Sequence, residues 1–307
     1  MTEMGSTKAP AGYEHPAYAA SLSEFGGVLR LPRSGGWALR RPIEGSAASD
    51  LIGPYPLFLC RDWAGLPQDM LELAGAAVSF SMVTDPFADL DLSSLKPCFD
   101  VAVPFKKHFI ADLSRPVESF VSKSHRDIAR RAAKKVDVAL APDPPALLAD
   151  WVALFSNLTR RHKIAGIRAF SERAFAQQLA IPGLAAFAAR EIATGAIVGL
   201  DLWYLQGDIA YGHLAAFSDR GYELSASYAT KWCVLNYFSG KARYLHLGAS
   251  AELSDSGLAQ FKRGWSSDTR TNYFFGKILD PAAYAALTRD NKAEAVSFFP
   301  AYRKGEF

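Results

Sequence analysis

Three apolar stretches joined by short glycine turns constrain the fold of this 307-residue chain more than any other feature. The stretches cover residues 184–192, 196–205 and 209–217, and the turns between them are Thr194-Gly195 and Gly207-Asp208. Apolar runs separated by such turns are typical of antiparallel hairpins, because glycine adopts the backbone conformations that tight turns need. Residues 184–217 are therefore expected to form three consecutive antiparallel strands.

Helical periodicity is present on both sides of these strands. The expected elements are helices 146–162 and 171–179 before the hairpins, then helix 225–238, strand 242–247, helix 257–263 and strand 271–279. Residues 122–136 are also expected to be helical, because Ser122 or Ser124 can cap them and no glycine or proline interrupts them. The helix at 225–238 returns the chain to a neighbouring strand, so this order predicts an α+β fold.

The first hundred residues predict a smaller α+β unit. Its expected elements are helices 16–25 and 66–76, strands 37–43 and 77–83, and an extended segment 99–113. Pro54 and Pro56 exclude a central strand over residues 52–59, because proline cannot donate to a strand ladder. Since 307 residues exceed an average domain, we expect three parts: a unit at 13–113, a second unit at 114–290 and a C-terminal tail at 291–307.

Composition excludes several classes of protein. Half of the residues are hydrophobic, which argues against disorder, collagen and coiled coil, and no apolar run reaches the ~18 residues of a membrane span. The N-terminus lacks the order of a signal peptide. Cys60, Cys98 and Cys233 are far apart, so neither a disulfide framework nor a metal site is expected. A soluble protein of the reducing cytoplasm is the expectation.

The positive charge is concentrated in one segment. The formal net charge is +3, but residues 122–135 alone carry +5. Within the expected helix, Arg126, Arg130 and Lys134 recur every four residues and so form a row on one face. Two interpretations are open: a solvated helix face, or a site that binds phosphate groups of a ligand or of RNA.

Two motifs and an aromatic segment resemble a known family. Residues 244–250 read YLHLGAS, residues 257–265 read GLAQFKRGW, and residues 273–275 read YFF. Together with the order of elements, these resemble the Fem-type (FemAB-like) branch of the GNAT acyltransferase superfamily and its BioF2-like (CelD-type) relatives. The resemblance covers about residues 108–288. It implies a GNAT fold made of two tandem halves, of which the first is degenerate.

The resemblance also implies acyl transfer to an amine, and a lysine at the reaction centre. Amide formation requires that the amine lose a proton and that the developing oxyanion be stabilised. The family's lysine corresponds to Lys262, whose ammonium group would balance the oxyanion. The alternative is a solvated lysine on a short amphipathic helix.

His213 is the second candidate catalytic residue. It lies on the expected strand 209–217, the splayed central strand that the family implies, and strand alternation places it on one face with Tyr211 and Ala215. A neutral imidazole there accepts a proton near pH 7. The alternative is a hydrogen-bonded core histidine.

Other residues complete the expected site or compete for its roles. Trp203, Phe261 and Trp265 are expected to line the substrate pocket, although aromatic residues in strands are more often core. Glu223 and Glu252 are alternative bases, and His246 is expected to be structural.

The residues that would bind the donor depart from the family pattern. GNAT enzymes hold the CoA pyrophosphate in a glycine-rich loop that opens a helix, because small residues let backbone N–H groups approach phosphate. Residues 220–227 read RGYELSAS and lack the pair of glycines. The candidate donor-binding residues are Arg220, Tyr222, Ser225 and Ser227.

Several functions remain open at this point. An acyl-CoA donor is slightly favoured, an aminoacyl-tRNA bound on residues 122–135 is the alternative, and no tightly bound cofactor is expected. The acceptor would be an amine on a small molecule or a glycan precursor. A non-catalytic binding module with the same fold is a further alternative, as is a nucleic-acid binder that uses the basic helix.

Overall fold

The computed structural model describes residues 9–249, 257–289 and 298–303, and the chain divides into two compact units. Unit 1 consists of Met1–His15, His108–Ile164 and Phe175–Thr269; unit 2 consists of Pro16–Lys107, Ala165–Ala174 and Arg270–Phe307. The division differs from the linear one expected from sequence. Strands β5 (Val101–Asp112) and β11 (Asp268–Ile278) each contribute residues to both units, so two of the boundaries fall inside strands.

Unit 1 contains the predicted hairpins. Its strands follow the order β5-β10-β9-β8-β7-β6, with β6 at Val136–Leu140, β7 at Leu184–Glu191, β8 at Ile197–Gln206, β9 at Ile209–Phe217 and β10 at Tyr244–Ala249. Gly195 and Gly207 have positive φ, which explains glycine at the two hairpin turns. Pairing is antiparallel except between β9 and β10, which run parallel because a helix connects them.

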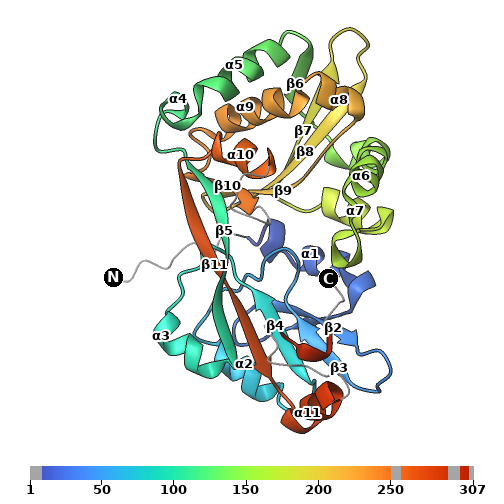
Figure 1. Cartoon of the computed structure of the whole chain (residues 1–307), viewed down its shortest axis with the longest axis vertical. Helices are drawn as coiled ribbons and strands as arrows, with labels where there is room; N and C mark the ends of the chain where they lie inside the picture. Colours follow the sequence, from blue (N-terminus) through green and yellow to red (C-terminus); the bar gives the residue numbers. More distant parts are fainter. Residues whose placement is uncertain (1–8, 250–256, 290–297, 304–307) are drawn as a thin grey trace. The chain divides into compact units, whose positions relative to one another are not determined.

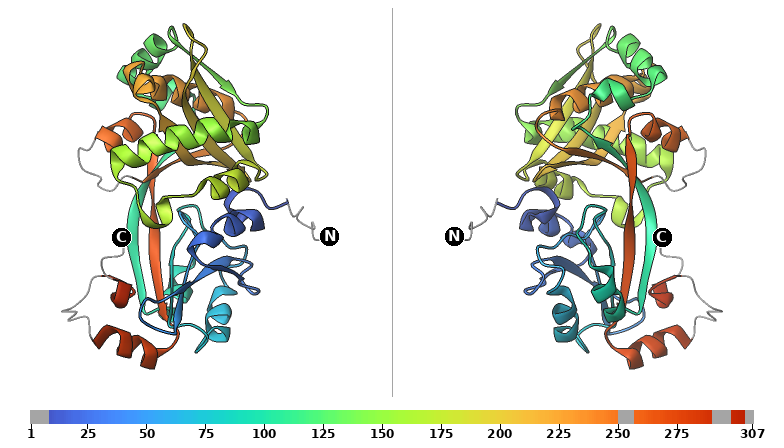
Figure 2. Two further views of the ribbon diagram at one scale, coloured as in Figure 1. Left: turned by 90° about the vertical axis from the view of Figure 1, so that its right-hand side faces the viewer. Right: turned by 90° about the vertical axis from the view of Figure 1, so that its left-hand side faces the viewer.

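Helices pack on these strands (Figure 1). They are α4 (Val117–Phe120), α5 (Lys123–Ala132), α6 (Leu148–His162), α7 (Glu172–Leu179), α8 (Asp219–Glu223), α9 (Ala226–Phe238) and α10 (Gly257–Arg263), with 3-10 turns at Gly12–Glu14 and Pro144–Leu147. Helix α9 contacts α5 and strands β6–β9, while α6 crosses β8 and β9 (Figure 2). The core beneath α9 includes Trp203, Phe238 and Trp265, all fully buried.

The basic helix ends earlier than its periodicity predicts. Ser122 caps α5 by accepting from the backbone of His125, but the helix stops at Ala132. A turn follows, in which the Lys135 amide bonds to the Ala132 carbonyl, and Val136 begins β6. Pairing with β7 therefore overrides helical periodicity, and Lys134 lies in the turn rather than on the expected helical row.

Unit 2 is a second, smaller α+β unit. Its strands follow the order β1-β2-β3-β4-β11, with β1 at Gly27–Arg30, β2 at Trp37–Pro42, β3 at Ser49–Ile52 and β4 at Ser79–Val83. Its helices are α1 (Pro16–Ser21), α2 (Leu66–Glu72), α3 (Leu92–Leu95) and α11 (Pro281–Arg289), with 3-10 turns at Ser23–Phe25, Lys96–Cys98, Gly166–Arg168 and Ala301–Arg303. Strand β3 ends at Ile52, before Pro54 and Pro56, as the prolines predict.

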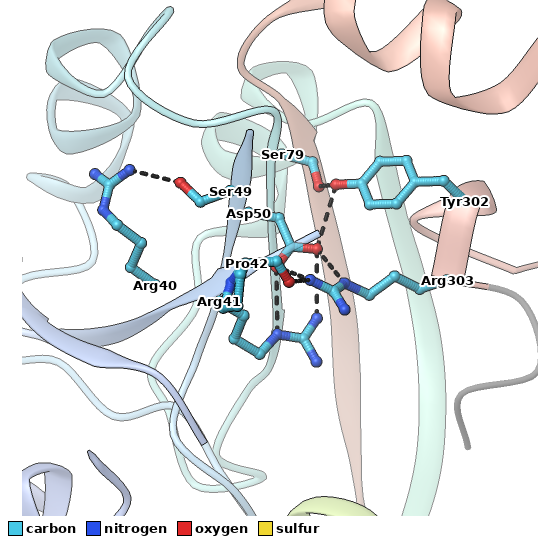
Figure 3. A network of polar contacts seen from close by, with 8 residues as sticks. All are labelled: Arg40, Arg41, Pro42, Ser49, Asp50, Ser79, Tyr302 and Arg303. Atoms are coloured by element: carbon cyan, nitrogen blue, oxygen red, sulfur yellow. Dashed lines mark hydrogen bonds and ion pairs between the residues drawn. The ribbon is translucent and has the colours of Figure 1, made fainter. Parts of the chain in front are cut away.

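A buried carboxylate holds the last described segment onto unit 2 (Figure 3). Asp50 on β3 is almost fully buried and binds the guanidinium groups of both Arg41 and Arg303. Tyr302 adds a hydroxyl between Asp50 and Ser79. Because one carboxylate serves two buried cations, the network is expected to matter for stability of unit 2.

No helix among the described residues is long and apolar enough to cross a membrane.

Candidate active site

Strands β9 and β10 separate in the middle of unit 1. Their parallel ladder contains three residue pairs and ends at His246 and Tyr211, although β9 continues to Phe217. A Cβ at Gly212 would lie 3.1 Å from the His246 carbonyl oxygen, so the strands are close up to this point. Both then carry irregularities in their pairing with their outer neighbours. This divergence agrees with the splayed strand expected for residues 209–217.

Gly248 and Ala249, at the end of β10, contact the ammonium group of Lys262. Gly248 has φ +77, and an ideal Cβ there would lie 3.1 Å from the Lys262 Nζ. The Lys262 ammonium donates a 2.6 Å hydrogen bond to the Ala249 carbonyl. Both the left-handed backbone and the tight space beside the lysine therefore favour glycine at 248.

Lys262 lies in an environment that weakens its charge. Burial, and secondarily the nearby charge of Lys231, lower the pKa of Lys262 to about 8. Lys231 itself is held by Asp201 at 2.8 Å, with its ammonium 4.4 Å from the centroid of the Trp203 ring. Near pH 7 Lys262 is thus predominantly an ammonium that can also release its proton, which suits a group acting on developing negative charge.

A pair of histidines lies at the same divergence. His108 Nδ1 and His246 Nε2 are 2.6 Å apart, and the rings stack with centroids 4.8 Å apart. Burial first, then the charges of His108 and Lys262, lower the pKa of His246 well below its ordinary value. His246 is therefore neutral at pH 7. His108 was not among the expected site residues, because only the pairing of β5 with β10 brings it beside His246.

His213 is enclosed in the core of unit 1. It is the extra residue of a bulge in β9, since Gly212 pairs with Trp203 and Leu214 with Leu202. Its ring nitrogens lie 3.1 Å from the Tyr13 hydroxyl and 3.1 Å from the Gln178 amide oxygen.

Burial lowers the pKa of His213 to about 3, so it stays neutral at pH 7. The bulge also changes strand alternation. Tyr211 and His213 both contact Tyr13, whereas Ala215 packs against a separate core cluster that includes Phe217 and Ala226 of α9. The expectation that His213 and Ala215 share a face is therefore wrong.

The three expected pocket aromatics are in or against the core. Trp203 and Trp265 are fully buried, and Phe261 packs against the same cluster. Phe261 and Trp265 flank Lys262 on and just after α10, and Trp203 lies under Lys231. Phe261 and Trp265 thus support the helix of Lys262, and Trp203 packs beside Lys231, whose charge acts on Lys262.

The expected donor loop is a helical turn, α8. Ser218 caps it, and the amides of Gly221, Tyr222, Leu224 and Ser225 all bond to acceptors within residues 218–222. A Cβ at Gly221 would lie 2.2 Å from the Val198 carbonyl oxygen, so this glycine allows packing rather than an approach to phosphate.

The side chains around α8 are also engaged. Arg220 binds Glu191 at 2.6 Å and Glu223 at 2.9 Å, and Tyr222 lies under the Arg161 guanidinium. Glu223 therefore serves as an ion-pair partner here. Two further candidates, Ser225 with left-handed backbone and half-buried Ser227, lie at the start of α9.

The basic segment offers cations at the surface, though not the expected row. Arg126 donates to the Glu118 carbonyl, and Arg130 pairs with Asp127. Within residues 122–135, the exposed cations with no side-chain partner in the described part of the chain are Lys123, Arg131, Lys134 and Lys135. Of the other expected site residues, Glu252 lies outside the described residues.

Comparison with known proteins identifies the fold. A scan against protein-family models finds no match, and neither does a search of curated proteins. Among solved structures the chain is similar to FemX, with a TM-score of 0.66 and 12% identity over 88% of this chain and 93% of that one.

Two further structures agree. The C-terminal domain of a putative lysylphosphatidylglycerol synthetase from Agrobacterium fabrum matches with a TM-score of 0.60 and 15% identity, covering 91% of this chain and 92% of that one. L-PGS from Bacillus licheniformis matches with a TM-score of 0.55 and 14% identity, covering 88% and 93%. The chain therefore has the mixed α+β fold of FemX, of this synthetase C-terminal domain and of L-PGS, in agreement with the Fem-like fold expected from the sequence.

Proposed function

We propose that this protein transfers an aminoacyl group from aminoacyl-tRNA to an amine and so forms an amide. The observation that carries the proposal is the Lys262 ammonium, held 2.6 Å from the Ala249 carbonyl where β9 and β10 separate. An ammonium fixed in a buried site stabilises a developing oxyanion without reorganisation during the reaction. Lys262 has the matching position in the Fem-type motif.

The reaction balances as an ester aminolysis. The acceptor nitrogen attacks the ester carbonyl, a C–N bond forms, and the carbonyl oxygen takes up negative charge beside Lys262. The C–O bond to the ribose then breaks, the ribose oxygen takes a proton, and the acceptor nitrogen loses one. The acceptor is an amine on a small molecule or a glycan precursor.

Two features of α8 support tRNA over acyl-CoA as donor. The backbone amides of Gly221, Tyr222, Leu224 and Ser225 are bonded within the turn, and Arg220 is paired with both Glu191 and Glu223. Binding a pyrophosphate there would require breaking both ion pairs. The name of one structural neighbour, lysylphosphatidylglycerol synthetase, also refers to an aminoacyl group.

The exposed cations of the basic segment supply the phosphate contacts. Lys123, Arg131, Lys134 and Lys135 are exposed around α5, and α5 packs directly on α9 beneath it. Each phosphate neutralised on single-stranded RNA contributes about −0.7 to the slope of log affinity against log salt. Four such contacts would make binding fall steeply with salt.

The test compares both donors on one protein. Calorimetric titration with acetyl-CoA is expected to show no binding, while labelled aminoacyl-tRNA binds with a steep salt slope. Changing Lys123, Arg131 and Lys135 to Glu should weaken tRNA binding, whereas Arg220→Ala should not. Micromolar acetyl-CoA affinity that Arg220→Ala abolishes would overturn the donor assignment in favour of acyl-CoA.

A second measurement separates an enzyme from a binding module. Transfer of the labelled aminoacyl group to pooled amine acceptors should be lost in Lys262→Met, while tRNA affinity is kept. Tight tRNA binding with no transfer by the unaltered protein to any acceptor tested would instead favour the non-catalytic module.

A further inference from the structure

We propose that His125 is a positioning residue that fixes Lys262 by capping the end of its helix. The proposal rests on the function proposed above for Lys262. His125 belongs to the first turn of α5, whereas Lys262 lies in the last turn of α10. Hydrogen bonds and ring packing join these two turns.

The last carbonyls of a helix have no partner inside it and need one from outside. In α10 the Trp265 amide bonds to the Lys262 carbonyl, so the Phe261 carbonyl is left for another donor. His125 Nε2 lies 3.1 Å from that oxygen. An N–H on Nε2 therefore caps α10 one residue before Lys262, and a backbone bond from Ser122 to the Gly264 carbonyl lies beside it.

A second contact sets the tautomer of this histidine. The Ser122 hydroxyl is 2.8 Å from His125 Nδ1. With Nδ1 accepting from that hydroxyl, the ring proton is on Nε2, the nitrogen that faces the Phe261 carbonyl. Burial lowers the pKa of His125, which keeps the ring neutral.

Packing leaves the ring little freedom. It lies between Tyr228 and Trp265, with centroids 5.1 and 5.0 Å away. A Cβ on Gly264 would lie 2.2–2.5 Å from three atoms of the His125 ring. This close approach explains the glycine before Trp265 in the GLAQFKRGW motif, since any side chain there would expel the histidine.

The consequence is a rigid link between the basic helix and Lys262. Helix α5, which carries part of the proposed RNA contact, determines through His125 where the end of α10 lies. A lysine side chain misplaced by ~1 Å at a reaction centre can lower the rate ~100-fold.

The test reads Lys262 directly and needs no substrate. Lysine reactivity toward acetic anhydride is measured against pH by peptide mass spectrometry, with the partly buried Lys231 as control. In the unaltered protein Lys262 should titrate near its lowered pKa. His125→Phe keeps a ring but loses the cap, and should move the Lys262 profile toward the ordinary range while the Lys231 profile stays. His125→Gln, whose amide can still donate to the Phe261 carbonyl, should restore it.

Gly264→Ala is the second variant, because its Cβ would clash with the His125 ring. It should shift the Lys262 profile in the same way and can replace His125→Phe if that variant does not fold. An unchanged Lys262 profile in the folded variant overturns the proposal, and so does an equal change at Lys231, which would indicate general loosening.

Once a donor is established, the steady-state kinetics of His125→Phe can be measured. His125→Phe should then lower kcat by up to ~100-fold at unchanged KM for the donor. If no transfer is found for the unaltered protein, the proposed function fails, yet the reactivity profile still decides whether His125 positions Lys262.

Discussion

The ammonium of Lys262 donates to the carbonyl oxygen of Ala249 at 2.6 Å, across the motif that ends β10. The carbonyl belongs to the residue after Gly248, whose left-handed backbone forms part of the irregular pairing with β5. The position of the Lys262 side chain and the backbone conformation at the end of β10 therefore depend on each other. A substitution that alters one should alter the other.

Turnover should fall as pH rises through the pKa of Lys262, which is about 8. The charged form drops from about nine-tenths at pH 7 to about one-tenth at pH 9, and with it the stabilisation of the oxyanion. Lys262→Arg, charged at all these pH values, should lose the descending limb even if its rate is lower. The measurement is kcat against pH, with exposed Lys241→Arg as a control. A limb that persists in Lys262→Arg would assign it to another group.

Gly248→Ala should lose both stability and activity. A left-handed backbone costs a non-glycine residue about 1–2 kcal/mol, and the new Cβ would crowd the Lys262 ammonium, only 3.1 Å away. Gly195→Ala is the matched control, because Gly195 has φ +73 but nothing within 4 Å of its Cβ position. Thermal unfolding should show similar losses for both variants, and only Gly248→Ala should lower turnover. Equal activities would show that Lys262 does not need this space.

His213 should contribute to stability rather than to catalysis. Burial lowers its pKa to about 3, so between pH 6.5 and 3 the unfolded chain binds a proton that the folded chain does not. The contribution is complete above pH 6.5 and is lost as pH falls, at up to ~1.4 kcal/mol per pH unit. His213→Gln should therefore unfold more easily at pH 7 but lose less stability between pH 7 and 5, by urea denaturation.

The same variant tests the catalytic alternative for His213. Loss of a general base lowers rates by about 10²–10⁴-fold. His213→Gln should keep turnover within tenfold of the unaltered protein at pH 7, and a larger loss at unchanged affinity would restore the histidine as a catalytic base. His162→Gln, on an exposed position of α6, should change neither rate nor stability.

Asp50→Asn should destabilise unit 2 by about 3–5 kcal/mol, because Arg41 and Arg303 would then be buried without a carboxylate. Glu72→Gln is the control: its ion pair with Arg33 is exposed, and such pairs contribute at most about 1 kcal/mol. Both are read by urea unfolding. Comparable losses for the two variants would contradict the role given to the buried network.

The local elements of unit 1 could be predicted from sequence, because their signals are contained in short segments. Helix α10 spans Gly257–Arg263, the range predicted, and the hairpin turns lie at Gly195 and Gly207. The end of α5 could not be predicted. Residues 133–136 continue the helical periodicity, and only pairing with β7 turns them away from the helix.

Some residues of the candidate site could likewise be predicted from the sequence, and others could not. The motif drew attention to Lys262 and to its neighbouring glycines, whereas His108 and His125 have no signal in their own segments. His108 meets His246 through strand pairing between residues 138 positions apart, and His125 meets Phe261 across 136 positions. The ion pair of Arg220 with Glu191 could not be predicted either, because the two residues are 29 positions apart in sequence and adjacent in the fold.

By itself, then, the sequence determined the strand and helix order of unit 1, its Fem-type motif and the lysine at its centre, since turn chemistry, periodicity and motif spacing are local. Tertiary structure decided the lowered pKa of Lys262, the neutrality of His213 and His246, and the ion pairs of Arg220 in α8. These properties depend on burial and on contacts with residues that are distant in sequence. Neither burial nor such contacts can be predicted from a local sequence pattern.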